Sequence, residues 1–231
     1  MDKIILASQS PRRRELLTQI GLDYQVIPST VEEVITETDP KLVVQELSRQ
    51  KAEDVAGSVL RDRIMREQWE KDTVEAENGR EGILVIGADT VVSYQGQILG
   101  KPVDTDDAVR MLSMLQGNAH SVFTGVTLIR RGLKETWQVT FAEETRVHMY
   151  PMTEAEIRWY VGTGEPMDKA GAYGIQGLCA RFVEKIEGDY NNVVGLPVGK
   201  IWQELKKRCR SSQKEGIADG TERIQAYGTV L

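Results

Sequence analysis

The feature that most constrains the fold is the stretch ILVIGADTVVSYQGQILGKP in the middle of the chain. Residues 83–86 form an unbroken aliphatic run, which is typical of a strand buried on both faces of an α/β sheet. Asp89 follows where this strand is expected to end, and ligands collect at the carboxyl ends of strands in open α/β sheets. Gln95-Gly96 predicts a two-residue hairpin, because glycine supplies the positive φ of a tight turn. The hairpin would return Lys101 towards Asp89 and form the floor of an active site. The alternative is that Asp89 caps a turn and Lys101 is solvated.

Length and composition are those of a globular protein that can form one large domain or two lobes: 231 residues, of which 40% are hydrophobic. The formal net charge is −6, so no overall positive field exists to hold nucleic acid. Cys179 and Cys209 have neither disulfide-framework nor zinc-ligand spacing. No segment reaches the roughly 18 apolar residues of a membrane span, and the apolar run at the N-terminus is too short for a signal peptide. We therefore expect a soluble, cytoplasmic protein without a nucleic acid or membrane partner.

The N-terminal segment KIILASQSPRRR predicts a strand, a loop and a helix. Ser10 is a natural N-cap, and Pro11 suits the first helical position. The hydroxyls of Ser8 and Ser10 would then lie with Arg12 and Arg13 beside the helix N-terminus. Backbone N–H groups, the helix dipole and full charges converge there, which predicts a site for a triphosphate or another phosphate ester. The alternative is an exposed basic helix face.

Two further groups could belong to such a site. Glu32 and Glu33 follow the second predicted strand, and paired carboxylates near a phosphate site usually serve a divalent metal. Taken alone, the pair is weak evidence, and the alternative is solvated surface. The helix that starts at Asp39-Pro40 carries Lys51, which is either a surface lysine or a phosphate ligand. The spacing alone does not decide between the two.

The second half of the chain predicts an antiparallel meander flanked by helices. Strands are expected at 126–129, 137–141 and 145–150, and a further one at 182–186. One helix is expected from Thr105 and another after Thr153, which opens a capping box. His120 and His148 are assigned structural roles, because no partner spacing suggests a pair of ligands.

Three segments differ in composition from the predicted strands and helices: a glycine-rich loop, a charged stretch and a polar C-terminal tail. Residues 168–177, DKAGAYGIQG, combine three glycines with an acid, a base and an amide, which allows close backbone approach to a ligand; the alternative is an irregular connection. The charged stretch 59–82 predicts a helix extension followed by a flexible, solvated loop. Residues 209–231 are expected to form a loosely ordered tail.

In this order the motifs ASQSPRR, VEE, LSRQKA, GADT, GKP, HSVFTGV, EPMDKAGAYGIQG and GDYNNVVGLP resemble the Maf family of nucleoside triphosphate pyrophosphatases, once described as septum-formation inhibitors. The resemblance spans about residues 3–208. It implies an α/β fold, Maf/inosine triphosphatase-like, with a mixed twisted sheet, flanking helices and two lobes around a central cleft. We expect one such domain over 1–208, and the family often forms homodimers. The insertion and the tail depart from the family pattern and leave dimer geometry open.

The resemblance also implies an activity, namely hydrolysis of a nucleoside triphosphate between the α- and β-phosphates with Mg²⁺ or Mn²⁺ as cofactor. The family's catalytic base maps to Asp89, and Glu33 matches the acid that helps Asp89 to hold the metal. The family's phosphate-contacting positions correspond to Ser8, Ser10, Arg12, Arg13, Lys51 and Lys101. Such positive preorganisation is what a phosphoryl transition state requires.

The subfamily that the chain resembles acts on dTTP and UTP, with specificity positions that correspond to Arg12, Thr90 and Gln176. A glutamine amide offers a donor and an acceptor, which suits the imide edge of uracil or thymine. Modified pyrimidine nucleotides fit the same expectation. Two alternatives stay open: a nucleotide-binding regulator of cell division, and the same enzyme acting on 7-methyl-GTP or inosine-type nucleotides.

Overall fold

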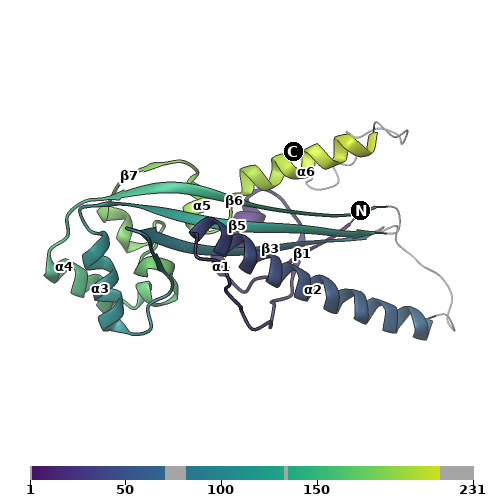
Figure 1. Ribbon diagram of the computed structural model, residues 1–231, viewed down its shortest axis with the longest axis horizontal. Coiled ribbons are helices and arrows are strands. Elements are labelled where there is room, and N and C mark those ends of the chain that lie inside the picture. The colour runs from purple at the N-terminus through teal and green to yellow at the C-terminus, as the bar shows by residue number, and fades with distance from the viewer. Residues whose placement is uncertain (1, 71–81, 133–134, 214–231) are drawn as a thin grey trace.

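The spine of the molecule is a seven-stranded mixed sheet with the order β2-β1-β3-β5-β6-β7, in which β4 pairs with β3 (Figure 1). The computed structural model describes residues 2–70, 82–132 and 135–213. The strands are β1 Lys3–Leu6, β2 Tyr24–Val26, β3 Gly82–Tyr94, β4 Gln97–Leu99, β5 Ala119–Gly132, β6 Thr136–Met149 and β7 Val183–Glu187. β1 pairs in parallel with β2 and β3, and the other pairs are antiparallel. The expected mixed α/β sheet with flanking helices is confirmed.

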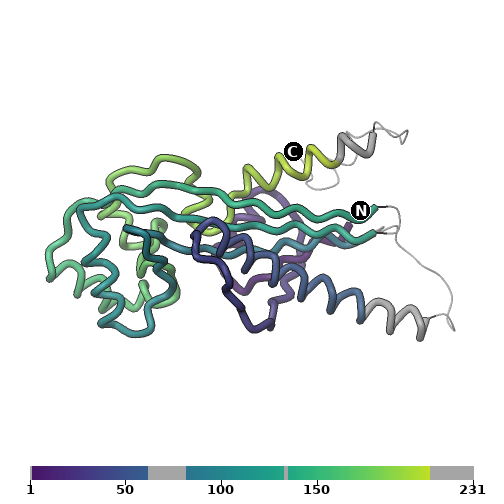
Figure 2. The backbone as a smooth tube through the Cα atoms, in the orientation of Figure 1, coloured from purple at the N-terminus to yellow at the C-terminus, as the bar shows by residue number. Residues whose placement is uncertain are grey.

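The helices fall into two groups along the long strands. They are α1 Pro11–Gln19, α2 Pro40–Glu70, α3 Thr105–Leu115, α4 Glu154–Gly162, α5 Tyr190–Val194 and α6 Val198–Gln213, with short 3₁₀ turns η1 Glu165–Asp168, η2 Ala170–Ala172 and η3 Leu178–Phe182. α3, α4 and the turns gather at one end, while α1, α2 and α6 flank the other (Figures 1 and 2). We call these ends the α3 lobe and the α1 lobe.

The strand β3 connects the hydrophobic cores of both lobes. Leu84 and Ile86 pack with α1 and α6, whereas Ile83 and Val85 pack with α2. This alternation follows the pleat of the strand and confirms that it is buried on both faces. Further along, Val92 belongs to the core of the α3 lobe. β3 therefore runs from one lobe into the other.

The predicted end of β3 before Asp89 is wrong. β3 continues to Tyr94, because β5 pairs with it along its whole length, from Gly82↔Gly132 to Ser93↔Ser121. On the opposite edge of β3, β1 stops at the Leu6↔Ile86 pair, and pairing with β4 begins only at Val92↔Leu99. Asp89 thus lies within a strand, but just beyond the point where the edge of that strand becomes uncovered.

Several local predictions are confirmed. The hairpin between β3 and β4 turns at Gln95 and Gly96, with φ of 47° and 78°. The capping box at the start of α4 is present, with Thr153 and Glu156 exchanging hydrogen bonds. At the start of α2, the Asp39 carboxylate accepts from the first backbone N–H groups. These features depend on neighbours within a few residues, which a sequence reveals directly.

The predicted meander has fewer and longer strands than expected. β6 runs unbroken through 142–144, and β5 begins at Ala119. The reason is the continuous ladder between the two strands, from Ala119↔His148 to Arg131↔Thr136. Glu143 lies in this ladder opposite Thr124, and its side chain meets Lys200 of α6 at 2.7 Å. Charged residues here mark a strand face rather than a break.

The structure describes part of the charged stretch 59–82 and part of the C-terminal tail 209–231. α2 extends to Glu70, which confirms the helix extension, while the loop predicted after it falls on 71–81, outside the described residues. α6 extends to Gln213, so residues 209–213 are helical and the tail boundary at 209 is corrected. Residues 214–231 lie outside the described part. Among the helices described, none is both long and apolar enough to cross a membrane.

Candidate active site

A cavity of about 1210 Å³ opens between the two lobes. All ten residues predicted for the site line it, namely Ser8, Ser10, Arg12, Arg13, Glu33, Lys51, Asp89, Thr90, Lys101 and Gln176. They come from α1 and the loop before it, the loop after β2, α2, β3, the segment after β4, and the loop between η2 and η3. The fold therefore brings together groups spread over most of the chain.

The start of α1 forms one wall, because β1 ends at Leu6 and a short loop turns the helix N-terminus towards the cavity. Ser10 caps the helix, with its side chain accepting from the Arg13 backbone N–H at 3.5 Å. The Ser8 hydroxyl accepts from the Ser10 N–H at 3.3 Å. The first turn of α1 contains no acidic residue, so the positive end of the helix dipole is not offset there. This geometry suits an anion.

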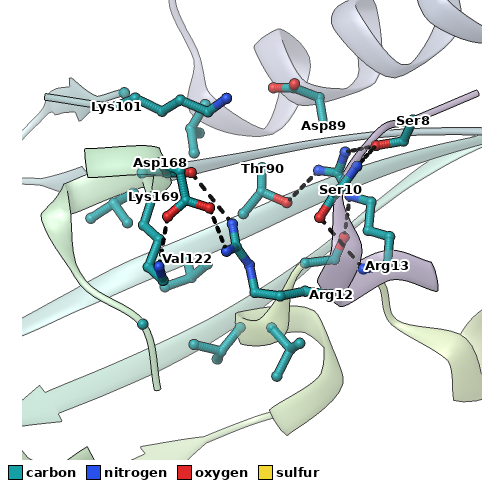
Figure 3. Close-up of a pocket in the computed structure, with 18 of the residues that line it drawn as sticks. Ser8, Ser10, Arg12, Arg13, Asp89, Thr90, Lys101, Val122, Asp168 and Lys169 are labelled. Carbon is teal, nitrogen blue, oxygen red and sulfur yellow. Dashed lines mark hydrogen bonds and ion pairs between the residues drawn. The ribbon is translucent and has the colours of Figure 1, made fainter. Parts of the chain in front are cut away.

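Asp89 and Thr90 occupy opposite faces of β3 at the uncovered edge. Consecutive side chains of a strand point to opposite faces, and Figure 3 shows these two diverging. Asp89 meets Lys51 of α2, whereas Thr90 meets Arg13 of α1. Because β1 has already ended, both residues line the same cavity. The site thus has an α2 face and an α1 face, which are joined by two adjacent residues.

On the α2 face, one lysine contacts two carboxylates. The Lys51 ammonium lies 2.5 Å from Asp89 Oδ1 and 2.9 Å from Glu33 Oε1. The side chains of Lys51 and Asp89 are 16% and 14% exposed. Partial burial strengthens this pair relative to one in bulk water.

Two glycines explain how α2 reaches the sheet. A Cβ at Gly87 of β3 would overlap the Ser48 carbonyl oxygen of α2, and one at Gly125 of β5 would overlap that of Val44. Glycine at both positions lets the helix backbone lie directly on the strands. Lys51, less than one turn beyond Ser48, then stands over Asp89.

The α1 face is organised by a partly buried guanidinium, that of Arg13. Arg13 donates to Ser8 Oγ at 3.0 Å, to Thr90 Oγ1 at 3.1 Å and to the Gly195 carbonyl oxygen at 2.8 Å (Figure 3). Burial lowers the pKa of Arg13, while Asp89 acts in the opposite direction. An arginine pKa begins so far above neutrality that the group keeps its charge. Arg13 is therefore a cation held in one orientation.

Arg12 links the α1 lobe to the α3 lobe. Its guanidinium lies 2.9 Å from Asp168 Oδ2, and the other oxygen of Asp168 accepts from Lys169 at 2.6 Å (Figure 3). Burial opposes ionisation of Asp168, but hydrogen bonds from Lys169 and Arg12 prevail and lower its pKa to about 2. Asp168 and Lys169 are the acid and base of the loop predicted to approach a ligand, but neither was assigned a role from the sequence. The signal was the acid and base beside three glycines.

Gln176 and Lys101 reach the cavity from the α3 lobe side. Lys101 follows the hairpin as expected, and in Figure 3 its side chain extends along the cavity on the same side of β3 as Asp89. The loop of Gln176 is anchored at both ends, by Gly174 N–H donating to Tyr160 Oη at 3.2 Å and Leu178 N–H donating to Glu165 Oε2 at 2.9 Å. Sequence reasoning missed both of these anchors.

The two histidines take no part in lining the cavity. His120 is buried and its Nε2 lies 2.7 Å from the hydroxyl of Tyr173, which does line the cavity. Burial, with a smaller effect of His148, lowers the pKa of His120 to about 4. His148 Nε2 lies 3.2 Å from Glu187. Both placements agree with the structural roles assigned from the sequence.

The acids of the α2 face fit a hard divalent cation. Glu33 and Asp89 already converge on one positive charge, that of Lys51. Mg²⁺ is usually held by one or two carboxylates together with substrate phosphates. In the part of the chain that the structure describes, no group of three or more His, Cys, Asp or Glu could hold a metal by itself. A cation bound here would therefore share its coordination with the substrate.

Fold and site together define a class, an α/β protein with an interlobe cavity for a phosphorylated ligand, since a capped helix N-terminus lines the cavity together with arginines, lysines and the Asp89 carboxylate. The particular family follows from comparison. The chain belongs to the Maf-like protein family, whose model matches residues 3–208.

Relatives with assigned names agree with one another. The chain is 55% identical over 210 residues to a dTTP/UTP pyrophosphatase of Agathobacter rectalis, covering 90% of this chain and 98% of the relative. It is 49% identical over 207 residues to a protein of the same name from Acetivibrio thermocellus, covering 89% and 95%. A third, from Lachnoclostridium phytofermentans, is 44% identical over 208 residues, covering 90% and 95%.

Proposed function

We propose that this protein is a dTTP/UTP pyrophosphatase, which hydrolyses the nucleoside triphosphate between the α- and β-phosphates and releases the monophosphate and pyrophosphate. The observation that carries the proposal is the Asp89 carboxylate, held by Lys51 within the same cavity as the arginines of α1. A base and a set of fixed cations are the two requirements for attack of water on a phosphoryl group. The shared name of the relatives supports the choice of substrate.

The residues divide the chemical work as follows. The N-terminus of α1, with Ser8, Ser10 and the two arginines, holds the phosphate oxygens and neutralises charge that develops on them. Asp89 orients a water molecule and takes its proton as the water oxygen attacks the α-phosphorus. The bond from the α-phosphorus to the bridging oxygen breaks, and pyrophosphate leaves. Lys51 keeps the Asp89 carboxylate in place, and Lys101 adds positive charge beside it.

The cofactor that we propose is Mg²⁺ or Mn²⁺, held by Glu33 and Asp89. When bound, the cation supplies Lewis-acid stabilisation of the phosphate oxygens and of the leaving group. Lys51 contacts both carboxylates, so a cation that binds them must displace Lys51 or share the carboxylates with it. The homodimer, the cytoplasmic location and the 1–208 domain boundary stay predictions from the sequence.

Recognition of the base is assigned to Gln176, Thr90 and Arg12. The amide of Gln176 can donate and accept at once, which matches the alternating carbonyl and imide groups of uracil and thymine. Gln176 is exposed on a loop whose ends are anchored, so it can adapt without losing its position.

The test is release of pyrophosphate, with Mg²⁺ or Mn²⁺, from dTTP, UTP, CTP, GTP, ATP, ITP and 7-methyl-GTP. Turnover confined to dTTP and UTP, and lost in Asp89→Asn, is the expected result. Turnover of 7-methyl-GTP or ITP instead would keep the enzyme and overturn its base preference. Tight nucleotide binding without pyrophosphate would overturn the enzyme and favour a regulator of cell division.

A further inference from the structure

A closed ring of hydrogen bonds lies beneath the α1 face of the site. Arg13 donates to Thr90 Oγ1 at 3.1 Å, and Thr90 Oγ1 lies 3.0 Å from Thr124 Oγ1. Thr124 Oγ1 donates to the Asn192 carbonyl oxygen at 2.9 Å. Gly195 N–H donates to that same oxygen at 3.0 Å, and the Gly195 carbonyl oxygen accepts from Arg13 Nε at 2.8 Å. We call these five residues the polar ring; it joins α1, β3, β5 and α5.

The direction of every bond in the polar ring follows from its chemistry. A guanidinium only donates, and a carbonyl oxygen only accepts. The single hydroxyl proton of Thr124 goes to the Asn192 carbonyl, so Thr124 can meet Thr90 only as an acceptor. Thr90 must therefore give its own proton to Thr124, while one of its lone pairs accepts from Arg13.

Thr90 is left with one lone pair and no proton for a ligand. Thr90 lines the cavity, whereas Thr124 is fully buried below it. A phosphate oxygen offers only lone pairs, so the Thr90 hydroxyl cannot bind one by donation. Thr90 also points to the opposite face of β3 from Asp89. Its partner is expected to be an N–H donor rather than a phosphate.

We propose that Thr124 is a positioning residue that makes Thr90 an acceptor-only hydroxyl, so that the site selects a base with an N–H at this point and rejects one with a bare ring nitrogen. This rests on the proposed function. Uracil and thymine carry an imide N–H, whereas the corresponding ring nitrogen of cytosine carries a lone pair. The polar ring is thus a filter for UTP and dTTP against CTP, set by a residue that does not touch the nucleotide.

The test compares Thr124→Val with Thr124→Ser. Valine has nearly the same shape but no acceptor, so it frees the Thr90 proton; the Asn192 carbonyl still accepts from Gly195. Because one hydrogen bond is worth roughly a 2- to 12-fold change in an equilibrium, the ratio of kcat/KM for UTP over CTP is expected to fall by about that factor in Thr124→Val. Thr124→Ser retains the hydroxyl and is expected to retain the ratio.

Two outcomes would overturn the inference. One is an unchanged ratio in Thr124→Val, including an equal loss for UTP and CTP, which is what a merely structural role predicts. The other is an equal fall of the ratio in both variants. Calorimetric binding of UMP and CMP to the same proteins separates this inference from the proposed function. If UTP is not turned over but Thr124→Val lowers a preference for UMP, the proposed function fails and the inference stands. If UTP is turned over and neither preference moves, only the inference fails. Absence of both turnover and UMP binding overturns both.

Discussion

The two faces of β3 at the cavity use different kinds of interaction. On the α2 face, Asp89 and Lys51 form a charged pair whose side chains are 14% and 16% exposed, with Glu33 beside them. On the α1 face, Thr90 belongs to a ring of directional hydrogen bonds that includes one partly buried cation, Arg13. Adjacent residues of one strand thus serve two tasks. In the proposed function, the α2 face carries the proton and metal chemistry, while the α1 face orients the nucleotide.

The strongest way to break this division is Asp89→Asn, which removes the base but keeps the shape of the side chain. We expect kcat for UTP to fall by about 10² to 10⁴, the usual contribution of general acid–base catalysis, with little change in UMP binding. Pyrophosphate release and calorimetry measure the two quantities. If Asp89→Asn retains kcat within tenfold, the assignment of Asp89 on the α2 face as the base is wrong.

The next effect in size is Arg13→Lys, which keeps a positive charge but loses the fork that reaches three acceptors. We expect kcat/KM to fall by about 10- to 150-fold, because hydrogen bonds from charged groups are worth about 1.5–3 kcal/mol. Arg14→Lys is the matched control, since Arg14 is exposed on the same helix, and it is expected to stay within about twofold. Equal losses in both variants would mean that the substitution disturbs helix α1 as a whole and that the contacts of the Arg13 guanidinium are not what matters.

The pH dependence of stability also bears on the comparison. Unfolding at low pH would lower activity just as the titration of a residue on either face would. His120, buried beneath Tyr173, has a pKa of about 4 in the folded protein against an ordinary 6.5. As the pH falls from 6.5 towards 4, the unfolded chain takes up this proton and the folded one does not, so folding is destabilised by up to about 1.4 kcal/mol per unit.

Urea denaturation of the wild type and of His120→Gln at pH 7 and pH 4.5 measures this effect. The fall in unfolding free energy over that range is expected to be smaller in His120→Gln than in the wild type. Equal falls in both proteins would assign the pH dependence to other groups.

The smallest effect is expected for Asp168→Asn, which releases Arg12 and removes a negative charge from the path of an anionic substrate. KM for UTP is expected to fall about two- to fivefold with kcat unchanged, as for a partly exposed ion pair, and less so at high salt. Asp168 has a lowered pKa of about 2, so this ion pair is fully present above pH 4 and is lost as the pH falls towards 2. Asp23→Asn, exposed and outside the cavity lining, is the control. A loss of kcat would place Asp168 in the chemistry.

Much of the site could be predicted because the residues that carry it occur in short motifs with local structure. Ser10 caps α1 by bonding the N–H three residues later, and Gln95-Gly96 supplies the turn that returns Lys101. All ten predicted residues line the cavity. The phosphate site at Ser8, Ser10, Arg12 and Arg13 was predicted from the residues themselves, whereas the roles of catalytic base and base selection were implied by the family resemblance. What was missed, such as Glu165 and Asp168, acts through partners that are distant in sequence or on another element.

By itself the sequence determined the elements and their ends wherever the cause is local: hydrogen-bond caps, glycine turns and the alternation of apolar residues act within a few positions. Only the tertiary structure decided how long β3 is, because that depends on the pairing with β5. The structure also decided that Lys51 meets Asp89, since two glycines must first let α2 lie on the sheet. Only the tertiary structure decided the direction of the hydrogen bonds through Thr90. The Asn192 carbonyl on α5, about a hundred residues away, takes the proton of Thr124, and Thr90 must then donate its own proton to Thr124.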